Sequence, residues 1–192
     1  TTVDKLDAED GFEASYIITS ESLDESNNLY PYGENRVYYN IQGDLNKVSM
    51  ENGNPIDPTS RTKSDFRALF FGKSRLFLRQ QPNAKTASVI TGSIMGDKAL
   101  YVSNTITIEA EDISILGDTK ASNLEILYTT NGDNPEINGL SYENPFQISD
   151  GTTVKAIVKQ NGNIVLTMEE SFGEKEGLFW GDDPSADMWV GR

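Results

Sequence analysis

Short apolar runs alternate with polar, turn-forming residues along the chain, and no long stretch shows the spacing of an amphipathic helix. Most apolar runs are rich in β-branched and aromatic residues and end in Gly, Asn, Asp or Pro, as strands of a β-sandwich do. In residues 36–41 the odd positions are apolar, whereas Arg36, Tyr38 and Asn40 would lie on the other face of a strand. The pattern predicts an all-β protein with half-buried strands.

The last strand pair shows the strongest local signal. In a strand over residues 154–159, Val154, Ala156 and Val158 would face one side of the sheet and the residues between them the other. Asn161-Gly162 then supplies the positive φ angles of a type I′ turn, and a return strand begins at Ile164. This stretch predicts a two-residue β-hairpin.

The strand pattern divides the chain in two near Ala110. About seven strands precede that residue, which is enough for one sandwich, and the pattern then restarts. We therefore expect β-sandwich domains over residues 1–110 and 111–172, followed by an aromatic and acidic tail over residues 173–192.

Composition narrows the functions that the chain can have. A formal charge of -14 disfavours nucleic acid and anionic lipid as partners, and no apolar run is long enough to cross a membrane. The chain contains no Cys and no His, so thiolate chemistry and the commonest general base and zinc ligand are excluded. The chain begins with Thr1 rather than Met, which fits a processed protein or a C-terminal piece of a longer one.

Acidic side chains are the first candidates for chemistry. Asp24 with Glu25, and Asp182 with Asp183, have no partner residue at a diagnostic spacing, so solvated surface charge is favoured over acid–base catalysis. The loop 131–136 is rich in Asn and Asp, but beside Gly and Pro these residues serve a turn better than a metal ion. We predict no catalytic residue, no cofactor and no metal site.

Aromatic side chains are the second candidates, because flat rings stack on the apolar faces of sugars. Candidates for carbohydrate contact by residue type are Tyr30, Tyr32, Tyr38, Trp180 and Trp189, and docking against another domain is favoured for the two Trp residues. Core packing is favoured for four other aromatic residues, Tyr39, Phe70, Phe71 and Phe77.

The run from Leu124 to Ala156 contains a Tyr-Thr-Thr-Asn-Gly turn from Tyr128, a Pro, a Tyr followed by Pro-Phe, and an apolar strand that ends in Val-Lys-Ala. In these features it resembles the C-terminal β-sandwich domain of the chitobiase and β-hexosaminidase type. This module is appended to many bacterial glycosidases and surface proteins.

The preceding region contains, in this order, an apolar strand ending at Gly43, a turn at Asn52-Gly53 and a turn at Phe71-Gly72 that leads into an apolar strand. In this order of features it resembles the immunoglobulin-like domain near the C-terminus of family 2 glycoside hydrolases, and Bacteroidetes-type β-galactosidases above all. The "GLFWGD" of the tail is also similar to the end of such enzymes.

The two resemblances imply two immunoglobulin-like sandwiches at the C-terminus of a retaining glycosidase whose catalytic barrel lies elsewhere. The chain itself would not be an enzyme, and its partners would be the catalytic domains of the parent enzyme or a neighbouring subunit. Carbohydrate binding and a role in a surface adhesin are the alternatives. The family implies a periplasmic or cell-surface location in a bacterium.

Overall fold

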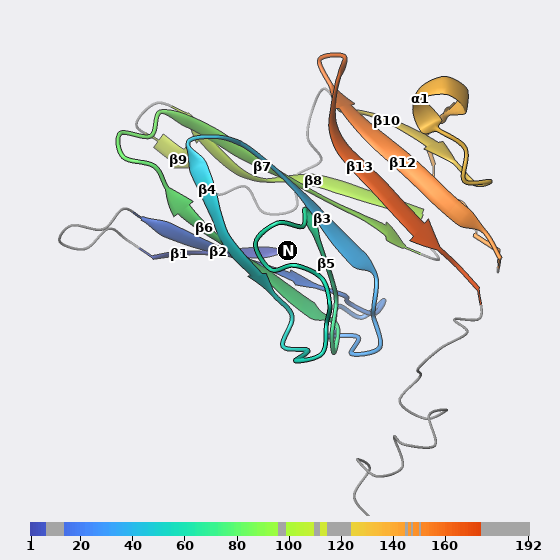
Figure 1. Ribbon diagram of the computed structural model, residues 1–192, viewed down its shortest axis with the longest axis horizontal. Helices are drawn as coiled ribbons and strands as arrows, with labels where there is room; N and C mark the ends of the chain where they lie inside the picture. Colours follow the sequence, from blue (N-terminus) through green and yellow to red (C-terminus); the bar gives the residue numbers. More distant parts are fainter. Residues whose placement is uncertain are drawn as a thin grey trace, which may run out of the picture.

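A computed structural model describes residues 1–6, 14–95, 99–109, 112–114, 124–144, 146, 148–149 and 151–173. These residues form three antiparallel sheets and one short helix, so the prediction of an all-β fold made of sandwiched sheets is confirmed (Figure 1). The predicted boundary at Ala110 and nearly all of the predicted tail lie outside the described residues.

Sheet 1 contains, in spatial order, β1 (Thr2–Leu6), β2 (Ser15–Glu21), β6 (Lys73–Gln80) and β4 (Leu45–Glu51). Sheet 2 contains β5 (Phe66–Ala68), β3 (Arg36–Gly43), β7 (Thr86–Met95), β8 (Ala99–Glu109) and β9 (Asp112–Ser114). Sheet 3 contains β11 (Leu140–Ser141), β10 (Leu124–Thr129), β12 (Thr153–Gln160) and β13 (Asn163–Ser171). The helix α1 (Pro135–Asn138) connects β10 to β11.

Sheets 1 and 2 form a sandwich around one hydrophobic core. Tyr16 and Leu76 of sheet 1 pack with Val37, Tyr39 and Val89 of sheet 2, and all of them are buried. The core arises because every second residue of these strands is apolar and points inward.

One polar group in this core is the Tyr39 hydroxyl, which lies 3.0 Å from Ser20 Oγ and 3.4 Å from Ser74 Oγ. Burial raises the pKa of Tyr39, although the two serine hydroxyls oppose that shift. The hydroxyl is thus both neutral at physiological pH and hydrogen-bonded, as a buried polar group must be.

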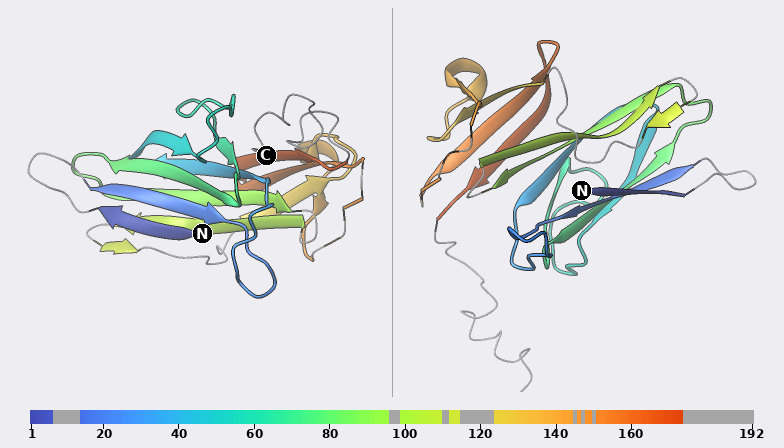
Figure 2. Two further views of the ribbon diagram at one scale, coloured as in Figure 1. Left: turned by 90° about the horizontal axis from the view of Figure 1, so that it is seen from below. Right: turned by 180° about the vertical axis from the view of Figure 1, so that it is seen from behind.

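Sheet 3 covers the outer face of sheet 2 and makes a third layer, which the views of Figure 2 show beside β7 and β8. Leu166 and Met168 of β13 pack with Tyr38 of β3 and Ile94 of β7 in a second core. Tyr38, a candidate by residue type for carbohydrate contact, is therefore buried, with only 5% of its surface exposed, and has no face free to stack on a sugar.

The predicted hairpin turn is confirmed. Asn161 and Gly162 have φ angles of 52° and 81°, as a type I′ turn requires, and they join β12 to β13. After the turn at 131–136, the described residues up to 144 form the helix α1 and only the two-residue strand β11.

A buried ion pair fixes the long loop between β4 and β5. Arg67 of β5 is 0% exposed, its Nε lies 3.3 Å from Asp57 Oδ2, and its Nη1 donates to Thr59 O at 2.6 Å. Asn52 Nδ2 also donates to Asp57 Oδ2, at 2.7 Å. Because a charge buried without a partner is costly, this loop is held against the sandwich by the guanidinium group.

Candidate ligand pocket

The two tyrosines that the sequence singled out lie in the loop 22–35, between β2 and β3. Backbone hydrogen bonds from Tyr30 N to Ser22 O (2.9 Å) and from Ser22 N to Gly72 O (2.9 Å) fold the loop back and attach it to the β5–β6 turn. The Ser22 hydroxyl also donates to Tyr30 O at 2.6 Å. The loop therefore holds its shape through its own bonds.

Asp24 shapes the tip of this loop. Its Oδ1 accepts hydrogen bonds from the backbone N–H groups of Ser26 and Asn28, each at 2.8 Å. The Asn28 backbone bond is the main reason why the pKa of Asp24 lies below its usual value. The carboxylate thus stays ionised while it serves the turn.

The loop, β2 and the ends of β3, β7 and β8 enclose a pocket of about 650 Å³. Its aromatic and apolar lining consists of Leu23, Tyr30, Tyr32, Val37, Leu69, Met95 and Tyr101. Its polar lining consists of Thr1, Ser20, Glu21, Ser22, Asp24, Glu25, Asn27, Gly33, Asn35, Thr91 and Ser93. The volume of this half-open pocket lies within the range of small-molecule sites.

Two glycines let the walls of the pocket come close together. A Cβ on Gly33 would lie 2.1 Å from Ser22 Oγ, and one on Gly72 would lie 2.4 Å from Tyr30 O. Gly72 also has a φ of 73°, which a side chain would strain. These contacts exclude any larger residue at either position without movement of the loop.

Tyr30 and Tyr32 lie together at the mouth of the pocket. Their ring centroids are 5.6 Å apart at an interplanar angle of 67°, and the residues are 47% and 79% exposed. One of these exposed rings can stack on a ligand's apolar face, while hydroxyl and amide groups of the pocket lining hydrogen-bond the ligand's polar groups.

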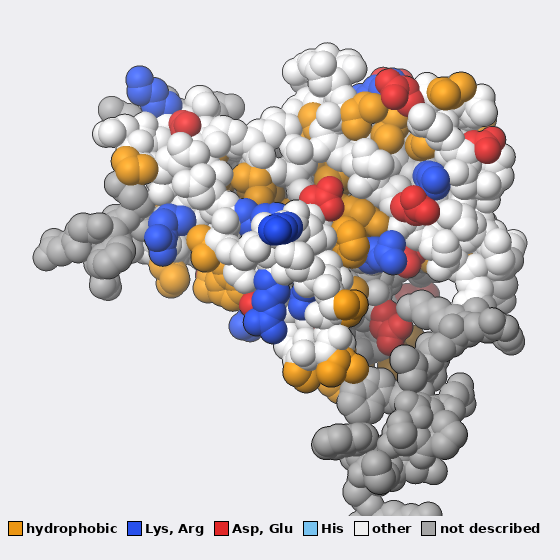
Figure 3. Space-filling model, viewed as in Figure 1, with side chains coloured by type: hydrophobic (Ala, Val, Ile, Leu, Met, Phe, Trp, Pro, Cys, Tyr) orange, Lys and Arg blue, Asp and Glu red, His pale blue; other side chains and the backbone are white. Residues whose placement is uncertain are grey.

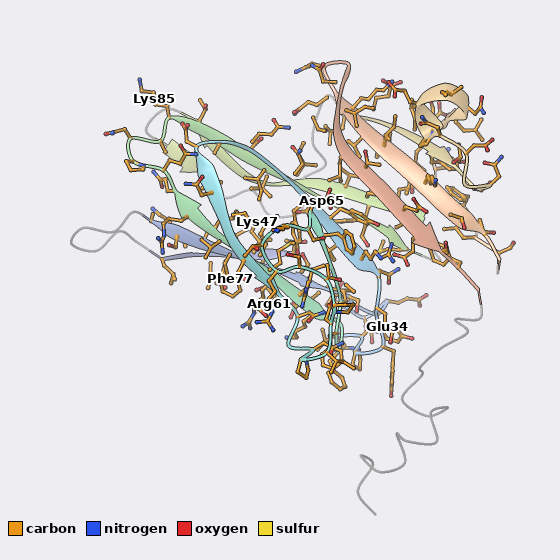
Figure 4. All side chains as sticks on the ribbon, viewed as in Figure 1. Glu34, Lys47, Arg61, Asp65, Phe77 and Lys85 are labelled. Carbon is orange, nitrogen blue, oxygen red and sulfur yellow. The ribbon has the colours of Figure 1, made fainter. Side chains whose placement is uncertain are left out.

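Apolar groups gather around the same end of the sandwich, where Figure 3 shows hydrophobic side chains at the lower end of the coloured surface. Phe71, in the β5–β6 turn, is 68% exposed and has a φ of 49°. The prediction of core packing was wrong for Phe71. The same prediction was wrong for Phe77, which lies on the outward face of β6 between the buried Leu76 and Leu78 (Figure 4).

A second, smaller hollow of about 360 Å³ lies where β3 and β4 meet β13. Lys47 and Asp65, which lie near each other in Figure 4, line it together with residues 164–167. Burial lowers the pKa of Lys47, while the charge of Asp65 opposes that shift. Sequence reasoning missed this site, because no local pattern predicts which strands sheet 3 covers.

The Asn- and Asp-rich loop after β10 is a turn. Asn131 Nδ2 donates to Asp133 Oδ2 at 2.9 Å, and Asn134 Oδ1 accepts from Glu136 N at 2.9 Å as the N-cap of α1. Within the part of the chain that the structure describes, no group of three acidic side chains could hold a metal ion, and no helix is long and apolar enough to span a membrane.

Trp180 and Trp189 lie outside the described residues, so the structure places neither of the two candidate docking residues. Tyr30 and Tyr32 are the two candidates that it brings together. The turn-forming residues around Tyr30 and Tyr32 are the sequence signal that could have indicated a pocket. The opposite wall of the pocket comes from β7 and β8, which are distant from the two tyrosines in the sequence.

Comparison with known proteins gives two matches. Residues 116–171 match the family model described as "Fn3 associated". Over all 192 residues the chain is 67% identical to a protein of Formosa agariphila named "Putative beta-glucuronidase". The chain spans 19% of that protein's length.

Two conclusions follow from these matches. The chain is homologous to one part of a much longer protein named as a glycosidase, in agreement with the glycosidase resemblance. That protein is named for glucuronidase activity, whereas the resemblance implied a β-galactosidase.

Proposed function

We infer that this chain is a non-catalytic accessory region of a glycosidase, located at the C-terminal end of a family 2 enzyme. The observation that carries this proposal is its 67% identity, along its full length, to 19% of a protein named as a glucuronidase. A catalytic barrel needs about 250 residues and alternating strands and helices. The described residues form antiparallel sheets instead, so this region fits a role in packing against a catalytic domain better than a catalytic role of its own.

The contact between sheets 2 and 3 supports a role as one rigid block. The Tyr38 hydroxyl donates to Glu169 O at 2.5 Å and accepts from Glu169 N at 3.1 Å, so it joins β3 to β13. Burial raises the pKa of Tyr38, although hydrogen bonds with Glu169 and Arg36 oppose that shift. The hydroxyl therefore keeps its proton for the Glu169 carbonyl at physiological pH.

Close backbone approach strengthens the same contact. A Cβ on Gly92 of β7 would lie 2.5 Å from Leu166 Cδ2 and 2.8 Å from Met168 Sδ. The two apolar side chains of β13 thus rest directly on the backbone of sheet 2. We propose that residues 1–110 and 111–172 are two domains that this contact holds together.

The isolated chain tests the non-catalytic part of the proposal. Incubation with 4-nitrophenyl β-D-glucuronide and 4-nitrophenyl β-D-galactoside should release no nitrophenol above the buffer rate. Turnover by the purified chain that survives further purification would overturn the proposal.

The tail tests the proposed partner. We propose that Trp180 and Trp189 dock on the catalytic domains or on a neighbouring subunit, because aromatic residues concentrate in a polar segment there. In the full-length enzyme, changing both to Ala should lower the melting temperature or weaken dimerisation, and an unchanged value for both would contradict the docking role. Export to the periplasm or cell surface, proposed from the family resemblance, is checked by fractionating the native bacterium.

A further inference from the structure

The pocket at the end of the sandwich has features that an accessory role does not require. Contiguous exposed apolar groups can mark a binding site, and Tyr32 leaves 79% of its surface in solvent beside Tyr30. The rings stand at the entrance of a cavity of about 650 Å³.

The floor and walls of the pocket supply groups that match a sugar. Val37 and Leu69 give it an apolar floor, while hydroxyl and amide side chains surround them. Asn35 uses Nδ2 to donate to Ile94 O at 2.8 Å, so its Oδ1 is available as an acceptor among the described residues. A pyranose presents the same combination, with an apolar face and hydroxyls at its edge.

The charge of the pocket selects among sugars. Three carboxylates line it, those of Glu21, Asp24 and Glu25, and the α-ammonium group of Thr1 is the one cationic group among its described lining residues. Lys73 Nζ neutralises one of them, since it lies 2.7 Å from Glu21 Oε1. The other two carboxylates would repel an anionic ligand, because like charges at short range disfavour binding.

We propose that this pocket binds a neutral saccharide and discriminates against uronate sugars, with the more exposed ring of Tyr32 stacking on a pyranose and the ring of Tyr30 packing against Tyr32 at an angle of 67°. The site would hold the protein on neutral glycan, whatever acidic sugar a catalytic domain cleaves. This inference stands apart from the accessory role proposed above, since either can fail while the other holds.

Matched ligands test the charge selection. The 192-residue chain is titrated, with chemical shifts in its NMR spectrum as the readout, against methyl β-D-glucopyranoside, methyl β-D-glucuronide and the neutral xylohexaose. Saturable shifts with the two neutral sugars are expected, and the glucuronide should bind at least about threefold more weakly at low salt. The difference in affinity between the glucoside and the glucuronide should shrink in 0.5 M NaCl, because salt screens the repulsion between carboxylates.

Matched variants test the residues. Tyr32→Ala should weaken xylohexaose binding by about tenfold, whereas Tyr32→Phe, which keeps the ring, should change it less than threefold. Ile137→Ala serves as the control, because Ile137 is an exposed apolar residue (77%) on α1, in a different layer. Circular dichroism of each variant checks that it is folded.

Three results would overturn the proposal. The first is the absence of saturable shifts with either neutral sugar, which would favour a protein surface as the occupant of the pocket. The second is glucuronide binding as tight as that of the glucoside. The third is unchanged binding by folded Tyr32→Ala, which would place the sugar elsewhere on the chain.

Discussion

Replacing Met168 by Ala should destabilise all three sheets together, although Met168 belongs to sheet 3. Its side chain is 0% exposed and packs in the core that sheet 3 shares with Tyr38, Ile94 and Leu100 of sheet 2. The substitution removes a fully buried side chain beyond Cβ and leaves a cavity that the backbone on either side cannot fill.

The expected loss is about 2–5 kcal/mol, as for other large-to-small changes in cores. A protein of this size has only about 5–15 kcal/mol of stability, so the variant loses a substantial fraction of it. The melting temperature should fall by roughly 5–15 °C.

Calorimetry and hydrogen exchange test this prediction. A single cooperative transition should move to lower temperature, and amides of β3 and β7 should lose protection together with those of β12 and β13. Ile164→Ala, on the same strand but 41% exposed, is the matched control and should cost about 1 kcal/mol or less.

Two results would contradict the prediction for Met168→Ala. One is a Met168→Ala variant that is no less stable than the Ile164→Ala control. The other is a pair of separate transitions, with the one assigned to sheets 1 and 2 unmoved, because the shared core would then not couple the layers.

Three further predictions follow from single contacts. Tyr38→Phe removes both hydrogen bonds to Glu169 and should cost about 1–3 kcal/mol in urea unfolding, and a loss indistinguishable from zero would count against this link. Phe71→Asn replaces an aromatic residue at a φ of 49° by one that tolerates that angle. We expect the free energy of unfolding to rise by about 0.5 kcal/mol, even though the ring contact with Phe70 is lost, and destabilisation would show that the turn is not strained. Burial raises the pKa of Asp57, but hydrogen bonds and the charge of Arg67 outweigh this effect, so the pKa lies below its usual value. Asp57 therefore stabilises the fold above about pH 4, and this stabilisation is lost as the pH falls through the lowered pKa. Asp57→Asn should therefore be less stable than the native chain at pH 7, with a difference that shrinks below about pH 4, and a difference independent of pH would contradict this assignment.

Features that depend on a few adjacent residues could be predicted from the sequence. The turn at Asn161-Gly162 follows from two residues that accept positive φ, and the turn at Asn131 follows from side chains that bond their own backbone. Both signals are complete within a few positions, so no knowledge of the rest of the fold was needed.

Features that depend on contacts between distant residues could not be predicted. Tyr38 is buried because a strand more than 120 residues later covers it, with Glu169 as its partner. Phe71 sits in an apolar run that is typical of a core strand, yet its turn places it in solvent. The pocket joins Tyr30 and Tyr32 to Thr91, which follows them far along the chain.

Deleting this region from the full-length parent protein tests its proposed role as an accessory region of a glycosidase. We expect a lower melting temperature, with kcat on an aryl β-glycoside within about twofold of the intact protein's value at a temperature where both are folded, because the proposed role places this region outside substrate chemistry. A tenfold or greater loss of kcat with an unchanged melting temperature would contradict the account.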